Sequence, residues 1–346
     1  MSKLILYAPN VNTGGGKTLL LGLLKALEGR DCLLILDQRL VHPTIKSNIL
    51  TKVNTTFSSR FKAEIALKNN SQPGDTILCF HSMPPLFKSK AKVIVYFHNK
   101  HMIGSAKLMF NEGAWTIFKL TIERIIAKIF YKNVNQYLVQ SQSTKRSLDF
   151  YYSKKMSQVD IFPFADFPDD SFDNVTDADK KFEFIYVSAG LKHKNHLNLL
   201  KSWVYLAKNG LFPKLTLTLA NDNAVSNNSA TIIEMNRLIE KYHLKIENLG
   251  WVDPQEVLRM YSNSKALIYP SFMESFGLPL IEAKNIGLPI IASELDYARD
   301  VCNPDESFDP NSHISIARAV MRFLKTETQQ NIIYSSKEFV DNLYNN

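Results

Sequence analysis

The sequence alternates short, uniformly apolar runs with longer segments of helical character, and it passes through this pattern twice. The first series, up to about residue 162, comprises KLILYA, CLLILD, DTILCF, KVIVYF and NQYLVQ. The second series comprises FEFIYVS, LTLTLA, IENLGW, ALIYPS and PIIAS, and it ends near residue 295. Strands that are apolar throughout and alternate with helices are typical of parallel sheets covered on both faces. The pattern therefore predicts an α/β protein with two Rossmann-like domains.

The stretch between the two series has the composition of a linker. It reads FPFADFPDDSFDNVTDADK and is rich in Pro, Asp, Asn and Ser. We predict an N-terminal domain over residues 1–165, a linker over 166–180 and a C-terminal domain over 181–332, since 346 residues suit two domains. The final stretch, SSKEFVDNLYNN, has a possible serine cap and helical apolar spacing. We expect a helix over about 333–346 that packs back onto the N-terminal domain.

The charge is distributed unevenly between the two halves. Residues 1–162 contain 23 Lys and Arg against 9 Asp and Glu, a balance of +14, whereas residues 163–346 contain 18 against 24, a balance of −6. A basic half suits an anionic membrane surface or a phosphorylated substrate, although a charged, solvated face needs no partner. Nucleic acid is disfavoured as a partner because no zinc-finger, RNP or heptad-plus-basic signature is present.

The cysteines and the N-terminus indicate a cytoplasmic protein. Cys32, Cys79 and Cys302 share no close spacing, so neither a disulfide framework nor a zinc knuckle is expected. The apolar run in MSKLILYAPN ends at once at Pro9 and Asn10, which is more typical of a first strand than of a signal peptide. No run reaches the roughly 18 apolar residues of a membrane span.

One N-terminal segment is basic, amphipathic and rich in large apolar residues. WTIFKLTIERIIAKIFYK, residues 115–132, places Lys119, Glu123 and Lys128 four or five positions apart, with Trp, Ile, Phe and Leu around them. Such a helix can rest on an anionic membrane. A helix buried in its domain explains the same pattern equally well, and both interpretations stay open.

The stretch VNTGGGKTLL, residues 11–20, ends in Gly-Lys-Thr as a Walker A loop does. That loop needs a glycine five positions before Gly16, where this sequence has Val11. The stretch instead predicts a strand, a tight turn and the start of a helix. Such a turn can offer backbone amides to an anion, or it can simply let two backbones approach closely.

The segment YPSFMESFGLPLIEAKNIGLPIIAS, residues 269–293, carries the most specific signal. ALIYPS predicts a buried strand, SFG a turn, and Pro279 the first turn of a helix. The amides of Ser275, Phe276, Gly277 and Leu278 would then point at one spot with a helix dipole behind them, which suits a diphosphate. Glu282, about one turn into the helix, could accept two hydrogen bonds from a ribose diol. Glu274 would lie on the other side, towards a sugar.

This arrangement resembles the E-x7-E motif of the retaining glycosyltransferases of the GT-B fold, the group-1 family or family 4. ENLGWVDPQEVLRMYSNSKALIYPS, residues 247–271, resembles the nucleotide-base loop, helix and strand of that family, which assigns Gly250, Trp251 and Val252 to donor binding. IASELDYARDV resembles the segment that follows. The resemblance implies two Rossmann-like domains whose parallel sheets face each other across a cleft.

A second match, YVSAGLKHKNHLNLLKSW, covers residues 186–203. In the family this loop carries a Gly-Arg pair and then a lysine, and both cations face the donor diphosphate. Lys194 falls at the lysine, while the arginine position is Ala189, a departure from the family. The resemblance therefore makes Lys194 the electrostatic catalyst and Lys192 a weaker candidate for donor binding.

The N-terminal half resembles the family less closely. VIVYFHNKHMIG resembles the strand that ends in a histidine near the donor sugar, which assigns a catalytic role to His98. His81 and His101 are alternative candidates for this catalytic histidine. The glycines at positions 14–16 fall where the family has a Gly-rich loop beside the donor phosphates and the acceptor, so Gly15 and Gly16 are assigned to donor binding.

The resemblance implies transfer of a hexose from a UDP- or GDP-sugar to an acceptor hydroxyl with retention of anomeric configuration. It implies no metal and no other cofactor. The Asp177-x-Asp179 pair resembles the metal motif of another transferase fold, but it lies in linker composition rather than after a buried strand.

The acceptor expected from a basic half and an apolar helix is a polyprenyl-diphosphate-linked glycan at the inner face of a bacterial membrane, as in O-antigen, lipopolysaccharide or capsule synthesis. Two alternatives remain at this stage. One is a nucleotide-sugar epimerase on the same plan. The other is a binding subunit without turnover, for which Ala189 is the one suggestive feature.

Overall fold

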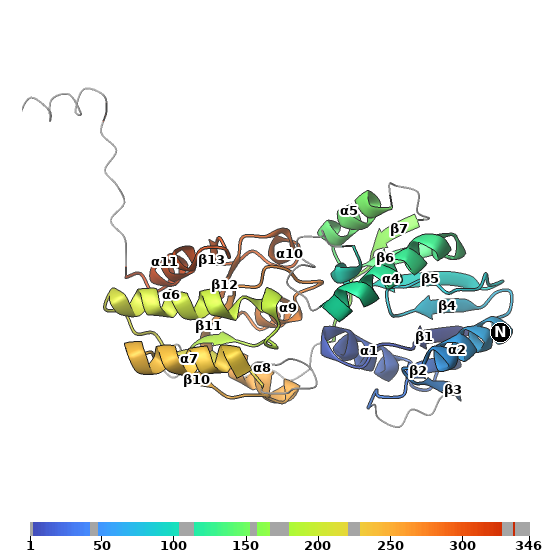
Figure 1. The fold of residues 1–346 in the computed structure, drawn as a ribbon, viewed down its shortest axis with the longest axis horizontal. Coiled ribbons are helices and arrows are strands. Elements are labelled where there is room, and N and C mark those ends of the chain that lie inside the picture. The colour runs from blue at the N-terminus through green and yellow to red at the C-terminus, as the bar shows by residue number, and fades with distance from the viewer. Residues whose placement is uncertain are drawn as a thin grey trace, which may run out of the picture.

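The computed structural model describes residues 3–41, 48–103, 114–152, 158–166, 180–220, 229–326 and 335. These residues form two α/β units, each with a parallel sheet between helices (Figure 1). The expected helix over 333–346 lies outside the described residues apart from residue 335, as does most of the linker. The domain boundaries therefore stay predictions.

The N-terminal sheet has seven strands in the order β3-β2-β1-β4-β5-β6-β7, and all neighbouring pairs are parallel. The strands are β1 (Leu4–Ala8), β2 (Cys32–Asp37), β3 (Asn48–Val53), β4 (Thr76–Cys79), β5 (Lys92–Phe97), β6 (Gln136–Val139) and β7 (Gln158–Ile161). The helices are α1 (Gly14–Ala26), α2 (Phe57–Asn69), α4 (Ala114–Phe130) and α5 (Gln142–Tyr151), with short 3-10 turns η1 (Lys100–Met102) and η2 (Tyr131–Asn133).

Both faces of this sheet are covered, as the apolar strands predict. Successive residues of a strand point to opposite faces. In β1, Ile5 and Tyr7 pack into a core shared with α2, α4 and α5, whereas Leu6 and Ala8 pack into a second core shared with α1. Both residues of each pair are almost fully buried. A β1 strand that is apolar throughout is therefore required, because neither of its faces meets water.

The C-terminal sheet has six strands in the order β10-β9-β8-β11-β12-β13, again all parallel. The strands are β8 (Phe182–Tyr186), β9 (Leu215–Leu217), β10 (Ile246–Asn248), β11 (Ser264–Tyr269), β12 (Ile290–Ser293) and β13 (Glu306–Phe308). The helices are α6 (His196–Lys208), α7 (Ser229–Tyr242), α8 (Pro254–Ser262), α9 (Leu278–Asn285), α10 (Asp296–Arg299) and α11 (His313–Phe323), with the 3-10 turn η3 (Lys192–Lys194). One hydrophobic core joins these elements.

Three strands were not among the predicted apolar runs, namely β3, β7 and β13. All three lie at an edge of their sheet. The burial of β7 and β13 is only partial, so the polar residues in QVDI and ESF are tolerated there. An edge strand has a neighbour on one side only and need not be apolar throughout.

The carboxyl-terminal ends of the two sheets face each other. The backbone amide of Lys100, just after β5, donates to Ser275 Oγ, just after β11, at 3.1 Å. The amide of Ser143, in the first turn of α5, donates to Asp300 Oδ2 at 3.0 Å. A Cβ atom added at Gly15 would lie 3.3 Å from Leu278 Cδ1, so the starts of α1 and α9 also meet here (Figure 1). The loops at these strand ends form the candidate site.

Candidate functional site

The turn between β11 and α9 presents unused backbone donors. Gly277 precedes the helix with a φ of 75°, in the left-handed region that favours glycine. No side chain caps α9 at this position, and Pro279 occupies its first turn. Among the described residues, the amides of Ser275 to Leu278 find no hydrogen-bond acceptor. The predicted turn is confirmed in geometry, and its donors suit an anion.

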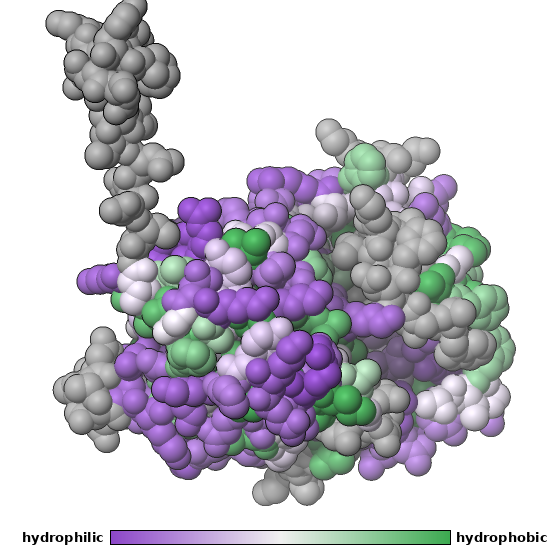
Figure 2. All heavy atoms as spheres, turned by 60° about the vertical axis from the view of Figure 1, so that its left-hand side comes forward, coloured by the Kyte–Doolittle hydropathy of each residue, from purple (hydrophilic) through white to green (hydrophobic). Residues whose placement is uncertain are grey.

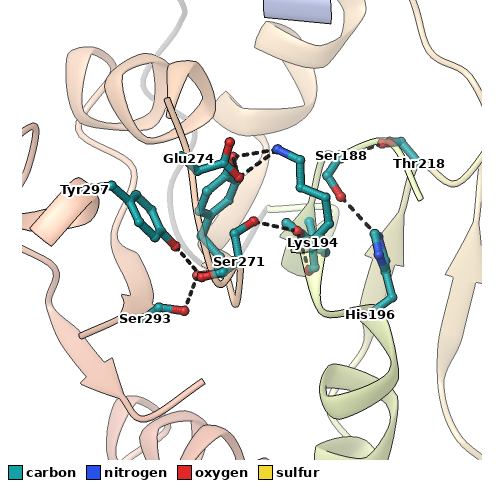
Figure 3. A network of polar contacts seen from close by, with 10 residues as sticks. Ser188, Lys194, His196, Thr218, Ser271, Glu274, Ser293 and Tyr297 are labelled. Carbon is teal, nitrogen blue, oxygen red and sulfur yellow. Dashed lines mark hydrogen bonds and ion pairs between the residues drawn. The ribbon is translucent and has the colours of Figure 1, made fainter. Parts of the chain in front are cut away.

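Lys194 and Glu274 form an ion pair beside this turn (Figure 3). Lys194 Nζ lies 2.7 Å from Glu274 Oε1, and the Tyr269 hydroxyl donates to the same oxygen at 2.9 Å. Both side chains of the pair are largely buried. Burial alone would raise the pKa of Glu274, but the charge and hydrogen bond of Lys194 outweigh it and lower the pKa. Glu274 is therefore held as a carboxylate, and most of the Lys194 charge is already balanced.

The loop that carries Lys194 is held by hydrogen bonds from side chains to backbone carbonyls. Tyr186, the last residue of β8, donates its hydroxyl to the Lys194 carbonyl at 2.7 Å. Asn195 adopts a left-handed φ of 62° and donates its side-chain amide to the carbonyls of Pro270 at 3.0 Å and Pro310 at 2.8 Å. Asparagine tolerates this conformation better than most residues. These bonds tie the turn after β8 to the turn after β11 and set the position of the lysine.

Glu282, one turn into α9, is half-buried, and no described residue hydrogen-bonds to its carboxyl group. Burial raises the pKa of Glu282 to about 7. A partly buried carboxyl group without a partner is uncommon because the lost hydration is not replaced. Such a group can accept hydrogen bonds from a ligand that brings its own hydroxyl donors.

The predicted base loop lies after β10. Gly250 has a left-handed φ of 71°, and its amide donates to Asn248 Oδ1 at 3.3 Å. Val252 packs against the C-terminal core. The Trp251 indole is 74% exposed, so its face is available for stacking. Contact of these three residues with a base stays a prediction.

The N-terminal half contributes His98 and the glycines of the first loop. A Cβ atom at Gly16 would lie 2.9 Å from His98 Cε1, so only glycine fits beside this imidazole. The ring stacks on Phe80 with centroids 5.1 Å apart. Burial lowers the pKa of His98 to about 4, so the ring is neutral at pH 7. Its Nε2 atom has no hydrogen-bond partner in the described part of the chain.

The first loop leads directly into α1. Thr13 precedes α1 and makes no side-chain capping bond, so α1 and α9 both present uncapped N-terminal ends where Gly15 meets Leu278. The positive ends of both helix dipoles therefore point into one region.

The other residues named from the sequence differ in their surroundings. Lys192 and Ala189 are exposed on the loop after β8. His81 packs edge-on against Tyr7 with ring centroids 5.0 Å apart, and burial lowers its pKa to about 3. The side chain of His101 and the pair Asp177 and Asp179 lie outside the described residues. In the described ranges, no three His, Cys, Asp or Glu side chains gather as metal ligands would.

Three residues at the site were not predicted from the sequence. Tyr269 ends β11 and holds Glu274, and a tyrosine at a strand end carries no signal by itself. Ser82, with a left-handed φ of 62°, accepts the amides of His98 at 3.0 Å and Asn99 at 3.1 Å. Lys100 reaches across to Ser275, a contact 175 positions apart in the sequence. Only its place two residues after His98 could have drawn attention to it.

Comparisons with known proteins agree with this geometry. The family described as glycosyl transferases group 1 matches residues 168–339. Over 88 residues, 25% of this chain, the sequence is 30% identical to the O-antigen chain mannosyltransferase B of Escherichia coli. That match spans 23% of the mannosyltransferase, so most of its length is not aligned with this chain.

Solved structures show the same fold over nearly the whole chain. HepE of Anabaena, in complex with UDP and glucose, aligns with a TM-score of 0.65 at 14% identity, covering 94% of this chain and 90% of that one. The lipopolysaccharide outer core galactosyltransferase WaaB aligns with a TM-score of 0.62 at 16% identity, covering 96% and 92%. The predicted GT-B fold, with two Rossmann-like units, is confirmed.

Replacing Glu282 tests how much its ionisation lowers the free energy of unfolding. The pKa of Glu282 is higher in the folded than in the unfolded protein, so the protonated carboxyl group favours folding. This stabilisation is complete below the unfolded pKa and is lost as the pH rises through about 7. Glu282→Gln cannot ionise. Between about pH 5 and about pH 8, the variant should gain on the order of 2 kcal/mol in free energy of unfolding relative to wild type.

Urea denaturation at the two pH values measures this difference. Glu240→Gln, at an exposed glutamate of α7, is the matched control and should follow the wild-type profile. If the free energies of unfolding of Glu282→Gln and wild type changed in parallel with pH, the raised pKa of Glu282 would be contradicted.

Proposed function

The chain belongs to the glycosyl transferases of group 1, and we propose that it moves a hexose from a UDP- or GDP-sugar to a hydroxyl of a glycan acceptor, with retention of configuration. The observation that supports this most directly is the turn after β11. Its four unused amides lie between the Lys194–Glu274 ion pair and the unpartnered carboxyl group of Glu282.

Each part of this group suits one part of a sugar nucleotide. The amides of Ser275 to Leu278 and the ends of α1 and α9 would hold the diphosphate. Glu282 would accept the ribose hydroxyls, and Trp251 would stack on the base. His98 and Glu274 would face the sugar. In HepE, the solved relative from Anabaena, the bound molecules are UDP and glucose, which favours a nucleoside-diphosphate sugar as the ligand class.

The reaction proposed is a substitution at the anomeric carbon. The acceptor oxygen forms a bond to the anomeric carbon while the bond between this carbon and the β-phosphate oxygen breaks. The released β-phosphate takes the proton of the acceptor hydroxyl on the same face of the sugar. The products are the glycoside and a nucleoside diphosphate. Fixed donors that meet the charge developing on the phosphate lower the barrier, which is the role proposed for Lys194 and the turn amides. No metal is needed for this step.

We propose a polyprenyl-diphosphate-linked glycan of bacterial surface polysaccharide synthesis as the acceptor. The named relatives include an O-antigen mannosyltransferase and a lipopolysaccharide galactosyltransferase. No helix among the described residues is long and apolar enough to cross a bilayer. Binding of a lipid-linked acceptor calls for a surface that meets the membrane.

The outer side of α4 supplies such a surface. Leu120 and Ala127 are buried in the N-terminal core, so this helix does pack into its domain. Its opposite side exposes large apolar residues at helical spacing, namely Phe118, Ile122, Ile125 and Ile129. Exposed Lys119 and Lys128 lie on the same helix. An apolar stripe flanked by lysines suits an anionic lipid surface.

The C-terminal half has a more hydrophilic surface than the outer side of α4. Figure 2, with that half brought forward, shows a mostly hydrophilic face. Its residues also carry the negative balance noted above. We therefore place the membrane contact on the N-terminal half.

Donor turnover separates this function from its alternatives. We expect slow hydrolysis of one member of a panel of UDP-, GDP- and dTDP-sugars, measured by chromatography of the released sugar and nucleotide. Lys194→Met should lower this rate by about 100-fold, since it removes a fixed donor at the leaving phosphate. Lys201→Met, at an exposed lysine of α6, is the matched control. An epimerase would return an isomerised sugar nucleotide instead, and a binding subunit would leave every donor intact.

Liposome flotation tests the membrane contact. The wild-type protein should float with vesicles that contain anionic phospholipid at low salt, and the double variant Ile125→Ser/Ile129→Ser should float less because it loses apolar area from the stripe. Ile233→Ser, at an exposed isoleucine of α7 in the C-terminal half, is the control. Wild-type protein that stayed wholly in solution, or a double variant that floated as well as wild type, would refute the contact.

A further inference from the structure

Lys100 connects the two halves of the molecule at the candidate site. It begins η1, directly after the loop that carries His98. Its backbone amide donates to Ser275 Oγ at 3.1 Å, so the residue lies against the turn with the unused amides. Its ammonium donates to Ser143 Oγ, in the first turn of α5, at 2.8 Å. The side chain thus starts beside the turn of the C-terminal half and ends on a helix of its own half.

The side chain of Lys100 is partly buried, and its ammonium has no acidic partner among the described residues. Within the described ranges it has a hydroxyl partner but no carboxylate at ion-pair distance. Burial lowers the pKa of Lys100, while the charges of Asp300, Asp296 and Glu274 partly oppose the shift. A buried cation without a charged partner is costly. Retaining one beside a turn of free amides is understandable if a ligand supplies the missing anion.

The charges around the turn show why a further cation is needed. Lys194 is already paired with Glu274 at 2.7 Å. Asp296 and Asp300 add negative charge close enough to Lys100 to oppose the lowering of its pKa. The positive end of a helix is equivalent to only about half a charge. A diphosphate with two or more negative charges would therefore meet a near-neutral or negative surface if the C-terminal half bound it alone.

We propose that Lys100 is a donor-binding residue, whose ammonium leaves Ser143 and contacts the diphosphate held at the Ser275–Leu278 turn. This inference rests on the proposed function, since it takes a nucleoside diphosphate as the ligand. It assigns part of the donor site to the N-terminal half. The contact between Lys100 and Ser275 then also brings the cation into place, so the donor is held best when the two halves touch.

The test compares UDP with UMP, because the proposed contact recognises the additional phosphate. Dissociation constants are measured by isothermal titration calorimetry for wild type, Lys100→Met and Lys100→Arg. Loss of one charge-assisted contact should weaken UDP binding by Lys100→Met by about 10- to 100-fold and change UMP binding little. Lys100→Arg keeps the charge and should retain most of the preference for UDP.

Lys92→Met is the matched control, since Lys92 is an exposed lysine at the opposite end of β5; it should bind both nucleotides as wild type does. Melting temperatures establish that each variant is folded, and Lys100→Gln replaces Lys100→Met if the latter unfolds. If a folded Lys100→Met or Lys100→Gln variant kept the wild-type ratio of UDP to UMP affinity, the proposed role of Lys100 would be overturned. The proposed function would be unaffected by that result. Wild-type protein that bound neither UDP nor GDP would instead overturn the proposed function, and this inference with it.

Discussion

The ion pair between Lys194 and Glu274 is the interaction on which the candidate site depends. It joins the loop after β8 to the turn after β11, two segments about 80 positions apart in sequence. Glu274 is buried among tyrosines, and a carboxylate there would be costly without a cation. Lys194 supplies that cation and so holds the carboxylate that directly precedes the turn of Ser275 to Leu278.

The second half of the site is brought in by close packing rather than by charge. Gly16 leaves room for the His98 ring, and Gly15 leaves room for Leu278. A side chain at Gly16 would collide with the imidazole, so these glycines are explained by close approach as well as by the start of a helix. Packing at this point places a neutral imidazole from one half near free amides from the other.

The sequence predicted the interior of each unit well because burial on both faces leaves a strong apolar signature, as in β1, β5 and β11. It predicted the turn before α9 because Gly277 and Pro279 each have a specific backbone requirement. It missed edge strands such as β3 and β13, which need not be apolar throughout. It also missed Lys100, whose importance arises only when the two halves meet, since nothing local distinguishes it from other lysines.

We propose that the turn after β11 binds the diphosphate of a sugar nucleotide while Glu282 holds its ribose. A crystal structure of the protein saturated with UDP, and another with GDP, tests this most directly. We expect phosphate oxygens within hydrogen-bond distance of the Ser275–Leu278 amides, and ribose hydroxyls on the Glu282 carboxylate, in at least one of the two crystals. A nucleotide bound elsewhere, with this turn empty in both crystals, would contradict it.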